Sequence, residues 1–441
     1  MTKGLSEAAL RSLRHPTLRQ QHGHHRLPLA QRVLHRERRA TTTPGLCVCG
    51  KVEDNRALAA SAPSPTPAGL YCFGKMSTLI SRPLGWALYT LFLAFVAEIV
   101  LRLALSSPEM IGRLGGETEA SWEAMWLSRH NRDTEIYYQF DRFHERRGWA
   151  SRPLLRDQRV FGDEVLNTNS AGFRGTREFA FEKAPGTFRI AVLGDSFTFG
   201  DEVSDHEAYP AQLHALLPRA EIINMGVHGY GHDQMLLLFE DEGVRYRPDL
   251  VILGFVAADM YRNLLAFRDY AKPSFVLVES ALVLRGVPVP PPEQFLRERS
   301  FQPKLVGVFQ LLKERFMRDR DALRERAEQL TAAILDRLAE GCRASGAALV
   351  LFYIPVPGEA KGETTPWAAE RAFFETYCSG NRQVSCGSAL SAIREEIARG
   401  RKFEPTPHWD SAGNRVIAES LRNHLCETRP LVCDVEIGAS R

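Results

Sequence analysis

The stretch from Phe188 to Gly200 reads Phe188-Arg-Ile-Ala-Val-Leu-Gly194-Asp195-Ser196-Phe-Thr-Phe-Gly200, and it decides the fold. Its first part is a short β-branched and aliphatic run, which is typical of a buried strand. Glycines on either side of Asp195 and Ser196 allow a tight turn before the helix that we expect next. Ligands of open α/β sheets bind at the carboxyl ends of strands, so this turn is the first candidate for a functional site.

Three further aliphatic runs follow the first one and alternate with amphipathic stretches. Strands that read as continuous apolar runs between helices indicate a parallel sheet with helices on both faces. A Pro-rich patch at residues 287–292 marks a long insertion between the third and fourth strands. The predicted strands are 189–193, 221–224, 249–253 and 347–353, and the predicted helices are 206–217, 232–245 and 321–343.

Composition limits the class of protein. The chain has 441 residues, of which 44% are hydrophobic and 25% are charged, and this excludes a wholly disordered chain, a collagen-like repeat and a multi-span membrane protein. Residues 1–75 contain 12 Lys and Arg against 4 Asp and Glu, with no sustained apolar period. We expect a basic disordered extension there, or sequence upstream of a true start at Met76.

An alternative function for the basic extension is a contact arm for nucleic acid or anionic lipid. No basic patch with interleaved aromatic residues continues into the expected folded body, so we predict that nucleic acid is not a partner.

A membrane segment follows the extension. The apolar run from Leu84 to Ala97 is interrupted by Glu98 and then continues to Arg102. Uninterrupted, it is shorter than the roughly 20 residues of a clean span, although snorkelling by Arg102 lengthens it. We predict one uncleaved membrane anchor at residues 76–105 rather than a removed signal peptide, and the alternative is a buried amphipathic helix of a soluble protein.

Charge predicts the topology of this anchor. Positive charge lies before the segment, which puts the N-terminus in the cytoplasm and the main domain on the extracytoplasmic, periplasmic side of the inner (cytoplasmic) membrane. Cysteine spacing bears on the same point, because Cys378 with Cys386 and Cys426 with Cys433 are near enough in sequence to close short loops in an oxidising compartment. Cys342 would then be a single buried thiol, although sequence does not fix connectivity.

Ser196 is a candidate nucleophile because the turn presents its hydroxyl at the start of a helix. The stretch is not the Gly-x-Ser-x-Gly elbow of the α/β-hydrolases, since Thr198 occupies the second glycine position. A Gly-Asp-Ser turn is equally compatible with an N-cap, in which Asp or Ser satisfies free helix amides. The residues of this turn alone do not choose between the two.

A serine nucleophile needs a base, which usually comes from a distant stretch of chain. His408 stands in Pro407-His408-Trp409-Asp410, on a loop just before an amphipathic helix, where it can reach across the sheet edge. A surface histidine near an N-cap is the plain alternative. The other histidines near the predicted strand ends are His206, His228 and His232.

Acyl transfer also needs hydrogen-bond donors for the oxyanion. A glycine-rich turn after the second strand, from Asn224 through Gly226 to Gly231, can offer backbone amides, or it is a plain tight turn. After the third strand come Asp259 and Asn263, again polar groups at a strand's carboxyl end. We expect Asp195 and Asp259 to contact the substrate at these converging ends.

In combination, these blocks resemble the SGNH hydrolases, or GDSL-type esterases and lipases, over roughly residues 165–426. The blocks are Gly194-Asp195-Ser196 with Phe199-Gly200, then Gly226, then His408 with Trp409 and Gly413. The resemblance implies a three-layer, flavodoxin-like α/β/α sandwich in which Ser196 is the nucleophile and His408 the base. It also implies that the amides of Ser196 and Gly226 are oxyanion donors. The lead-in segment with Asn169-Ser-Ala-Gly-Phe-Arg174 looks like that of membrane-anchored bacterial members.

The chain departs from the family pattern in two places. Ala258 stands where the third block has an oxyanion asparagine, so that donor is missing unless Asn263 or Asn224 substitutes for it. Loss of one donor costs about 10²–10³ in turnover. Thr406 and Pro405 stand where the family has its triad aspartate.

The nearest carboxylates to His408 in sequence are Glu404 upstream and Asp410 downstream. Of these we select Glu404 as the expected orienting acid. Without such an acid the imidazole is poorly held, with losses of up to about 10⁴.

We therefore predict a serine esterase or O-acyltransferase that acts on an ester of a cell-envelope glycan or lipid, with no need of a metal or organic cofactor. The alternative is a catalytically impaired relative that binds an envelope glycan or a partner. The predicted divisions are an extension at 1–75, an anchor at 76–105, a lead-in at 106–180, the main domain at 181–426 and a tail at 427–441. The sequence leaves the oligomeric state open.

Overall fold

The computed structural model describes residues 77–116, 118–130, 138–299, 302–362 and 367–433. The basic extension at 1–75 lies outside the described residues, as do residues 434–441 of the expected tail.

A five-stranded parallel sheet forms the centre of the main domain, with strand order β11-β10-β7-β5-β6. The strands are β5 (Phe188–Gly194), β6 (Ala220–Gly226), β7 (Leu250–Phe255), β10 (Ala348–Tyr353) and β11 (Ser385–Ser388). The first four confirm the predicted strands. β11 was not predicted, because Ser-Cys-Gly-Ser is not an apolar run. It is recruited by parallel pairing with β10, in which Val350 lies opposite Ser385.

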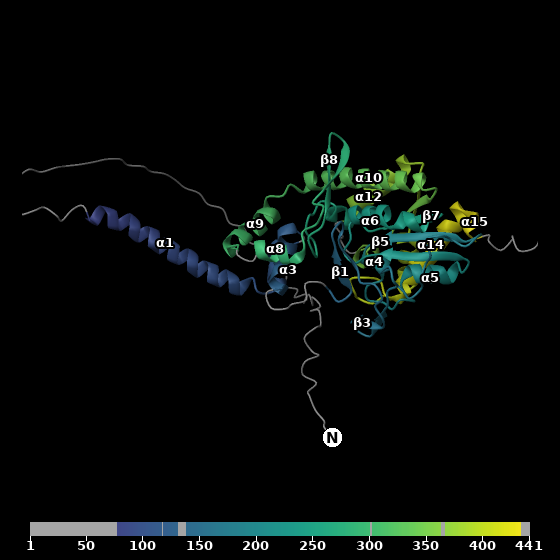
Figure 1. The fold of residues 1–441 in the computed structure, drawn as a ribbon, viewed down its shortest axis with the longest axis horizontal. Helices are drawn as coiled ribbons and strands as arrows, with labels where there is room; N and C mark the ends of the chain where they lie inside the picture. The colour runs from purple at the N-terminus through teal and green to yellow at the C-terminus, as the bar shows by residue number, and fades with distance from the viewer. Residues whose placement is uncertain (1–76, 117, 131–137, 300–301, 363–366, 434–441) are drawn as a thin grey trace, which may run out of the picture. The chain divides into compact units, whose positions relative to one another are not determined.

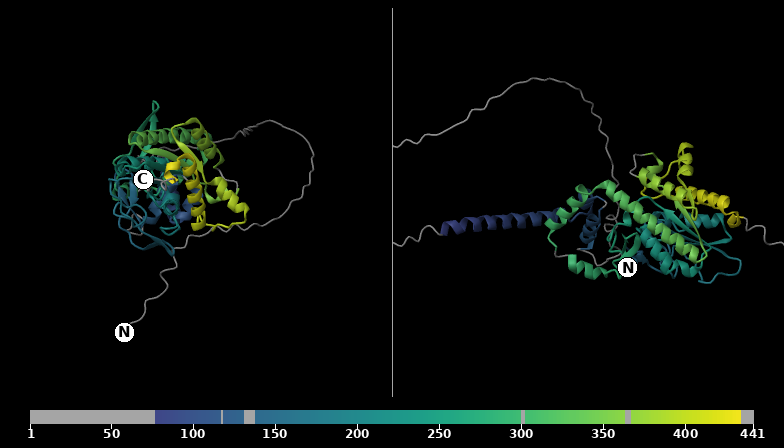
Figure 2. Two further views of the ribbon diagram at one scale, coloured as in Figure 1. Left: turned by 90° about the vertical axis from the view of Figure 1, so that its right-hand side faces the viewer. Right: turned by 90° about the horizontal axis from the view of Figure 1, so that it is seen from above.

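Helices cover both faces of the sheet, which confirms the predicted three-layer α/β/α sandwich (Figure 1). Side chains of one strand alternate between the two layers: Ala191 and Leu193 pack into one apolar core, and Ile190 and Val192 into the other. On the first face lie α6 (His232–Asp241), α10 (Arg320–Ala344) and α12 (Ala368–Gly380), and on the second α5 (Tyr209–Leu216), α13 (Leu390–Ala398) and α14 (Ser411–Thr428). Seen from above, the long helix α10 lies across the sheet (Figure 2).

Five further short elements lie between or after these strands and helices. They are α4 (Ser196–Phe199), the 3-10 turn η1 (Gly243–Tyr246), α7 (Asp259–Arg262), α11 (Pro357–Ala360) and α15 (Pro430–Cys433). The predicted insertion lies between β7 and β10. It holds a hairpin, β8 (Ser274–Val278) with β9 (Ala281–Arg285), and two helices, α8 (Pro292–Arg299) and α9 (Lys304–Phe316).

The lead-in before the sheet has its own elements and packs on the main domain. They are α2 (Pro108–Gly115), α3 (Glu119–His130), β1 (Asp141–His144), β2 (Gly148–Ser151), β3 (Gln158–Phe161) and β4 (Glu164–Leu166). Trp149 is fully buried, and its indole donates a hydrogen bond of 2.8 Å to the carbonyl of His228 beyond β6.

The first described element is the helix α1 (Ser77–Ala104). Its segment Arg82–Ala104 has 23 residues and is long and apolar enough to cross a membrane. The segment exceeds the uninterrupted apolar run of the sequence because the helix continues through Glu98 and Arg102, whose side chains form an ion pair at 2.8 Å.

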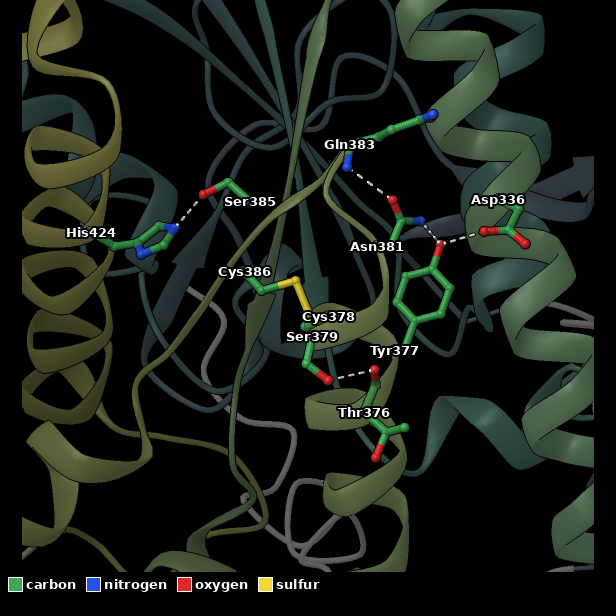
Figure 3. Close-up of a disulfide and its surroundings, with 10 residues drawn as sticks. All are labelled: Asp336, Thr376, Tyr377, Cys378, Ser379, Asn381, Gln383, Ser385, Cys386 and His424. Carbon is green, nitrogen blue, oxygen red and sulfur yellow. Dashed lines mark hydrogen bonds between the residues drawn. A yellow bond between two sulfur atoms is a disulfide. The ribbon is translucent and has the colours of Figure 1, made fainter.

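Two disulfides tie down the C-terminal part of the domain. Cys378 at the end of α12 bonds Cys386 in β11, and Cys426 of α14 bonds Cys433, so both predicted pairings are confirmed. Figure 3 shows the first bridge holding the edge strand against α12, beside the hydrogen bond from Tyr377 to Asp336 of α10. Among the described cysteines Cys342 alone is free, and it is buried, as expected.

Candidate active site

The turn after β5 presents Ser196 at the start of the one-turn helix α4. Asp195, not Ser196, is the N-cap of this helix, because its carboxylate accepts the Phe197 amide at 3.0 Å. Gly194 is required here, since a Cβ at this position would lie 1.9 Å from the Thr198 hydroxyl oxygen. Asp195 is therefore the residue that caps the helix. The Ser196 hydroxyl lies at the long distance of 3.5 Å from Asp195 Oδ2 and has a closer partner.

That partner is His408. Its Nε2 atom lies 2.8 Å from the Oγ atom of Ser196, across 212 residues of chain. The loop before α14 fixes the ring position from both sides: Thr406 Oγ1 donates to the His408 carbonyl at 2.8 Å, and the buried Trp409 indole donates to Pro355 O at 2.7 Å. Asp410 then caps α14 by accepting the Gly413 amide.

Glu202 faces the other nitrogen of the imidazole. Its Oε2 atom lies 3.4 Å from His408 Nδ1 and accepts the His408 backbone amide at 3.3 Å. Within the part of the chain that the structure describes, Nδ1 is buried and makes no hydrogen bond of its own. Burial raises the pKa of Glu202, but its interactions with His408 outweigh burial and hold that pKa below its usual value.

The backbone at Glu202 has a positive φ of 67°, which is uncommon for a residue with a side chain. Strained conformations of this kind persist where the surrounding structure enforces them. The preceding Gly200, with φ of 89°, ends α4 in the left-handed region and starts this reversal of the chain. The result is a carboxylate turned back toward His408.

Arg174 of the lead-in supports the loop that carries Glu202. Its buried guanidinium donates to the carbonyls of Gly200 at 3.0 Å and of Val203 at 2.8 Å, and it pairs with Asp205 at 2.5 Å. It also donates to the Phe199 carbonyl at 3.2 Å. The lead-in motif that ends at Arg174 is thus part of the support of the site.

Glu404, the acid expected from the sequence, is in a different position. Its backbone amide donates to Asp410 at 2.9 Å, and the structure gives its carboxylate no contact with His408 among the described residues. The carboxylate that accompanies the imidazole is Glu202. Sequence reasoning missed it because Asp201 and Glu202 follow the serine block as ordinary acidic loop residues, and nearness in sequence to Ser196 was the one available signal.

Asp195 and Asp259, expected to contact substrate, are both fully buried. Arg262 joins them, with Nη1 at 3.0 Å from Asp195 Oδ2 and 2.5 Å from Asp259 Oδ1. Burial raises the pKa of Asp259 well above its usual value in spite of Arg262, whereas the two carboxylates together outweigh burial and raise the pKa of Arg262. We interpret this cluster as the support beneath the serine turn rather than as a substrate contact.

Of the expected oxyanion donors, the backbone amides of Ser196 and Gly226 lie at the serine turn, whereas the Asn263 side chain does not. Gly226 ends β6 opposite Gly194, beside the backbone of α4, but its amide donates to the Asn224 side chain at 3.0 Å. Among the described residues the Ser196 amide donates to no protein acceptor. Asn263 is turned away, because its side chain accepts the Asp233 amide and donates to Thr331 at 2.9 Å.

Asn224 does not replace the missing third donor in this structure. Its amide nitrogen donates to the Thr198 carbonyl at 2.8 Å, and its oxygen accepts from Gly226. Ala258 stands at the family's asparagine position, as read from the sequence. The Ser196 amide can therefore donate to an oxyanion without rearrangement. The Gly226 amide can do so only if it also keeps, or first breaks, its hydrogen bond to Asn224.

The remaining candidate histidines are not beside Ser196. His206 is exposed, and His232 is fully buried against Phe255, where burial lowers its pKa to about 3. His228 lies near the site, and its Nδ1 atom is 2.5 Å from Asp201. Burial alone would lower the pKa of His228, but Asp201 and Asp269 outweigh it and raise the value to about 9.

The arrangement can perform acyl transfer. A serine hydroxyl, an imidazole and a carboxylate follow one another within hydrogen-bonding or ion-pair distance, which is the geometry of an activated serine nucleophile. Their chain order is Ser196, Glu202 and then His408.

Residues 192–377 match the family model described as GDSL-like Lipase/Acylhydrolase family. The matched segment contains Ser196, Glu202 and Gly226 and ends before His408. No curated protein sequence matches the chain.

Solved structures of esterases and lipases are similar to part of the chain. A two-domain esterase active on acetylated mannans, co-crystallised with mannopentaose, has 16% identity and a TM-score of 0.33 over 55% of this chain and 50% of its own. The chain thus spans half of that two-domain protein. A member of the lipolytic protein G-D-S-L family from Veillonella parvula has 12% identity and a TM-score of 0.34 over 55% of this chain and 98% of its own. A GDSL-like lipase from Bacteroides thetaiotaomicron has 12% identity and a TM-score of 0.32 over 54% and 88%.

Proposed function

Because this chain belongs to the SGNH hydrolase superfamily of GDSL-type esterases and lipases, we propose that it is a serine esterase or O-acyltransferase that forms an acyl-enzyme on Ser196. The observation that carries the proposal is the 2.8 Å separation of Ser196 Oγ and His408 Nε2. We further propose that its substrate is an ester of a cell-envelope glycan or lipid.

In the proposed mechanism Ser196 Oγ attacks the ester carbonyl carbon while His408 Nε2 takes the hydroxyl proton. The carbonyl oxygen becomes an oxyanion, which the Ser196 amide can bind. The intermediate collapses, the carbon–oxygen bond to the alcohol breaks, and His408 returns the proton to the leaving alcohol. Water or an acceptor hydroxyl then attacks the acyl-enzyme by the same route in reverse.

In this mechanism Glu202 is a positioning residue. A carboxylate beside Nδ1 favours the tautomer that carries its proton on Nδ1, which leaves the Nε2 lone pair directed at Ser196. The same carboxylate stabilises the imidazolium that forms when His408 takes the serine proton. Glu202 thereby takes the role that the sequence assigned to Glu404.

We also propose that α1 anchors the chain in the inner membrane with the main domain on the periplasmic side. Support comes from the apolar segment Arg82–Ala104 and from the two disulfides, which are typical of oxidising compartments. Such an anchor would hold the enzyme close to envelope lipids and glycans. Protease added to intact spheroplasts tests the orientation. We expect the protease to cleave the main domain there, as it does in open vesicles. A main domain that is cleaved only in open vesicles would contradict the proposed orientation.

The test of the catalytic proposal is hydrolysis of a short p-nitrophenyl ester by the full chain and by Ser196→Ala. We expect turnover in the parent and none in the variant, together with covalent labelling of the parent alone by a fluorophosphonate. Ser420→Ala is the matched control and should retain activity, because it removes a half-buried hydroxyl on α14 that makes a long hydrogen bond of 3.3 Å to the Ser388 carbonyl, outside the site. Equal turnover in the parent and Ser196→Ala would overturn the proposed nucleophile.

A second candidate function is a catalytically impaired protein that binds an envelope glycan or partner. It is favoured by the engagement of the Gly226 amide with Asn224 and by the buried position of Asn263, which leave few oxyanion donors. A parent that binds envelope glycans but neither turns over esters nor reacts with the fluorophosphonate would favour this function over the first.

A further inference from the structure

Helix α9 has an apolar side that the protein core covers. Leu311 is buried there against Leu105 and Ile111, with Val308 partly buried beside them. This side attaches α9 to α2 and to the chain that leaves α1. The buried side of α9 is therefore packed within the chain, beside a cavity that Gly307 and Leu311 line together with residues of α3.

A second apolar stripe runs along the exposed side of α9. Leu305, Phe309, Leu312 and Phe316 follow one another at intervals of four, three and four residues, which places them on one helix face. Phe309 is 66% exposed and Phe316 is 74% exposed. Large aromatic side chains aligned in this way on a surface mark an interaction site rather than scattered surface apolar residues.

Helix α9 begins directly beside α1. The Glu98 carboxylate of α1 accepts the backbone amides of Lys304 at 2.9 Å and Leu305 at 3.1 Å, which are free amides of the first turn of α9. Arg102 neutralises the same carboxylate. These contacts account for an acidic residue in the apolar helix, since it is paired and bonded to a helix N-terminus.

The position of Glu98 fixes the level of α9 along α1. Glu98 lies six residues before the end of the segment Arg82–Ala104, or about 9 Å along the helix axis. A hydrocarbon core about 30 Å thick takes up about 20 residues of helix. If α1 spans a bilayer with this segment centred on the hydrocarbon core, Glu98 and the first turn of α9 lie about 7 Å inside the end of the core, and not out in the water. The apolar face of a helix in the membrane interface reaches a similar depth.

The basic residues around α9 are also consistent with a position at the membrane interface. Lys304, Lys313, Arg315, Arg318 and Arg320 lie on or just after the helix. Two of them also contact the protein, since Arg315 donates to the Arg113 carbonyl and Arg318 pairs with Glu314 at 3.9 Å. The nearby acids are engaged with the protein: Glu314 accepts the Ala120 amide, and Asp319 caps α10. Basic side chains beside an apolar stripe are typical of helices that lie in the membrane interface, because their charged ends reach the phosphate groups.

We propose that α9 is a membrane-surface helix, lying in the interface of the leaflet from which α1 emerges, with the Leu305–Phe316 stripe in contact with phospholipid acyl chains. The inference rests on the proposed placement of α1 as a membrane anchor. The main domain is then attached to the bilayer at two places, one through α1 and one through α9. Such an attachment restricts how the domain turns relative to the membrane.

The test uses the full chain reconstituted in vesicles of phosphatidylcholine and phosphatidylglycerol. In a parent with Cys47, Cys49 and Cys72 replaced by Ser, single cysteines at Phe309 and Phe316 carry the environment-sensitive dye NBD. The matched control is Gln310→Cys, an exposed position adjacent to Phe309 that faces away from the stripe. The unmodified parent should take no dye, because Cys342 is buried and the other described cysteines are in disulfides.

We expect blue-shifted emission from dyes at Phe309→Cys and Phe316→Cys, with loss of fluorescence when nitroxide-labelled lipid is present. The dye at Gln310→Cys should show neither effect. Leu93→Cys reports on α1 itself and should also be quenched. Quenching at Leu93→Cys with none at the two α9 positions would overturn the α9 proposal alone, and absence of quenching at all positions would overturn it together with the anchor.

Ester hydrolysis by the same vesicles keeps the catalytic proposal separate. Phe309 and Phe316 lie outside the site around Ser196, so the labelled variants should hydrolyse p-nitrophenyl ester as the parent does. Retained turnover also shows that each labelled chain is folded. Quenching equal at Gln310→Cys and Phe309→Cys would contradict an oriented helix and overturn the proposal.

Discussion

Glu202 Oε2 lies 3.4 Å from His408 Nδ1, while Ser196 Oγ lies 2.8 Å from the Nε2 atom of the same ring. The imidazole is thus placed between a hydroxyl and a carboxylate that are six residues apart in sequence. Ser196 and Glu202 both follow the carboxyl end of β5, whereas His408 comes from a distant segment of the chain.

Replacement of Glu202 by Gln should lower kcat by up to about 10⁴-fold, because the amide no longer favours the Nδ1–H tautomer. KM should change little. Steady-state hydrolysis of p-nitrophenyl ester checks this, with Glu404→Gln as the control that keeps parent activity. Loss of activity in Glu404→Gln with none in Glu202→Gln would restore the acid expected from the sequence.

Replacement of Arg174 by Ala should destabilise the domain by about 3–5 kcal/mol, since it leaves a paired carboxylate and several carbonyls without their buried donor. Activity should fall as well, because the loop that carries Glu202 loses its support. Denaturant unfolding and ester hydrolysis measure the two effects. Arg177→Ala removes an exposed guanidinium and should change stability by less than about 1 kcal/mol; equal losses in the two variants would argue against a specific support role.

Replacement of Gly226 by Ala should disturb the serine turn. The added Cβ would lie 2.3 Å from the Phe199 amide nitrogen and 2.7 Å from the Thr198 carbonyl carbon, so backbone must move. We expect a loss of about 1–3 kcal/mol in stability together with reduced kcat. Gly307→Ala on α9, where nothing lies within 4 Å of the new Cβ, should instead be neutral or stabilising. An unchanged Gly226→Ala enzyme would show that α4 is free to shift.

Stability should fall as pH rises from 6.5 to about 9, because the pKa of His228 is 6.5 in the unfolded chain and about 9 beside Asp201 and Asp269. In this range the folded state binds more protons than the unfolded state, so deprotonation removes stability. Asp141, whose burial raises its pKa from 3.8 to about 8, adds a slope of the same sign up to that pH, while Arg268 opposes the charge on His228.

The part due to His228 is isolated by His228→Gln. Unfolding midpoints of the full chain in detergent micelles, measured at several pH values, should show a smaller decline above pH 6.5 in this variant. Parallel declines in parent and variant would assign the effect to other groups.

The sequence predicted the elements whose signal is local. Four strands are continuous apolar runs, and the Ser196 turn lies at the carboxyl end of the first of them. The His408 loop lies between α13 and α14, and it was predicted from its place just before an amphipathic helix and from the family pattern, not from a strand end. β11 escaped prediction because its register comes from β10 and a disulfide. The role of Glu202 was not predicted, because its side chain is directed toward His408 by the turn at Gly200 and by Arg174, which is 28 positions away in sequence. Asn263 was misplaced because the short helix α7 turns its side chain toward α10.

The buried guanidinium of Arg174 also decides where a minimal working fragment of this protein can begin. The match to the family starts at residue 192, and the first strand of the sheet at Phe188, yet a chain cut there would lose the donor that holds the Phe199, Gly200 and Val203 carbonyls. The unit that keeps Glu202 beside His408 therefore includes the lead-in, and it begins earlier in the chain than the match at residue 192.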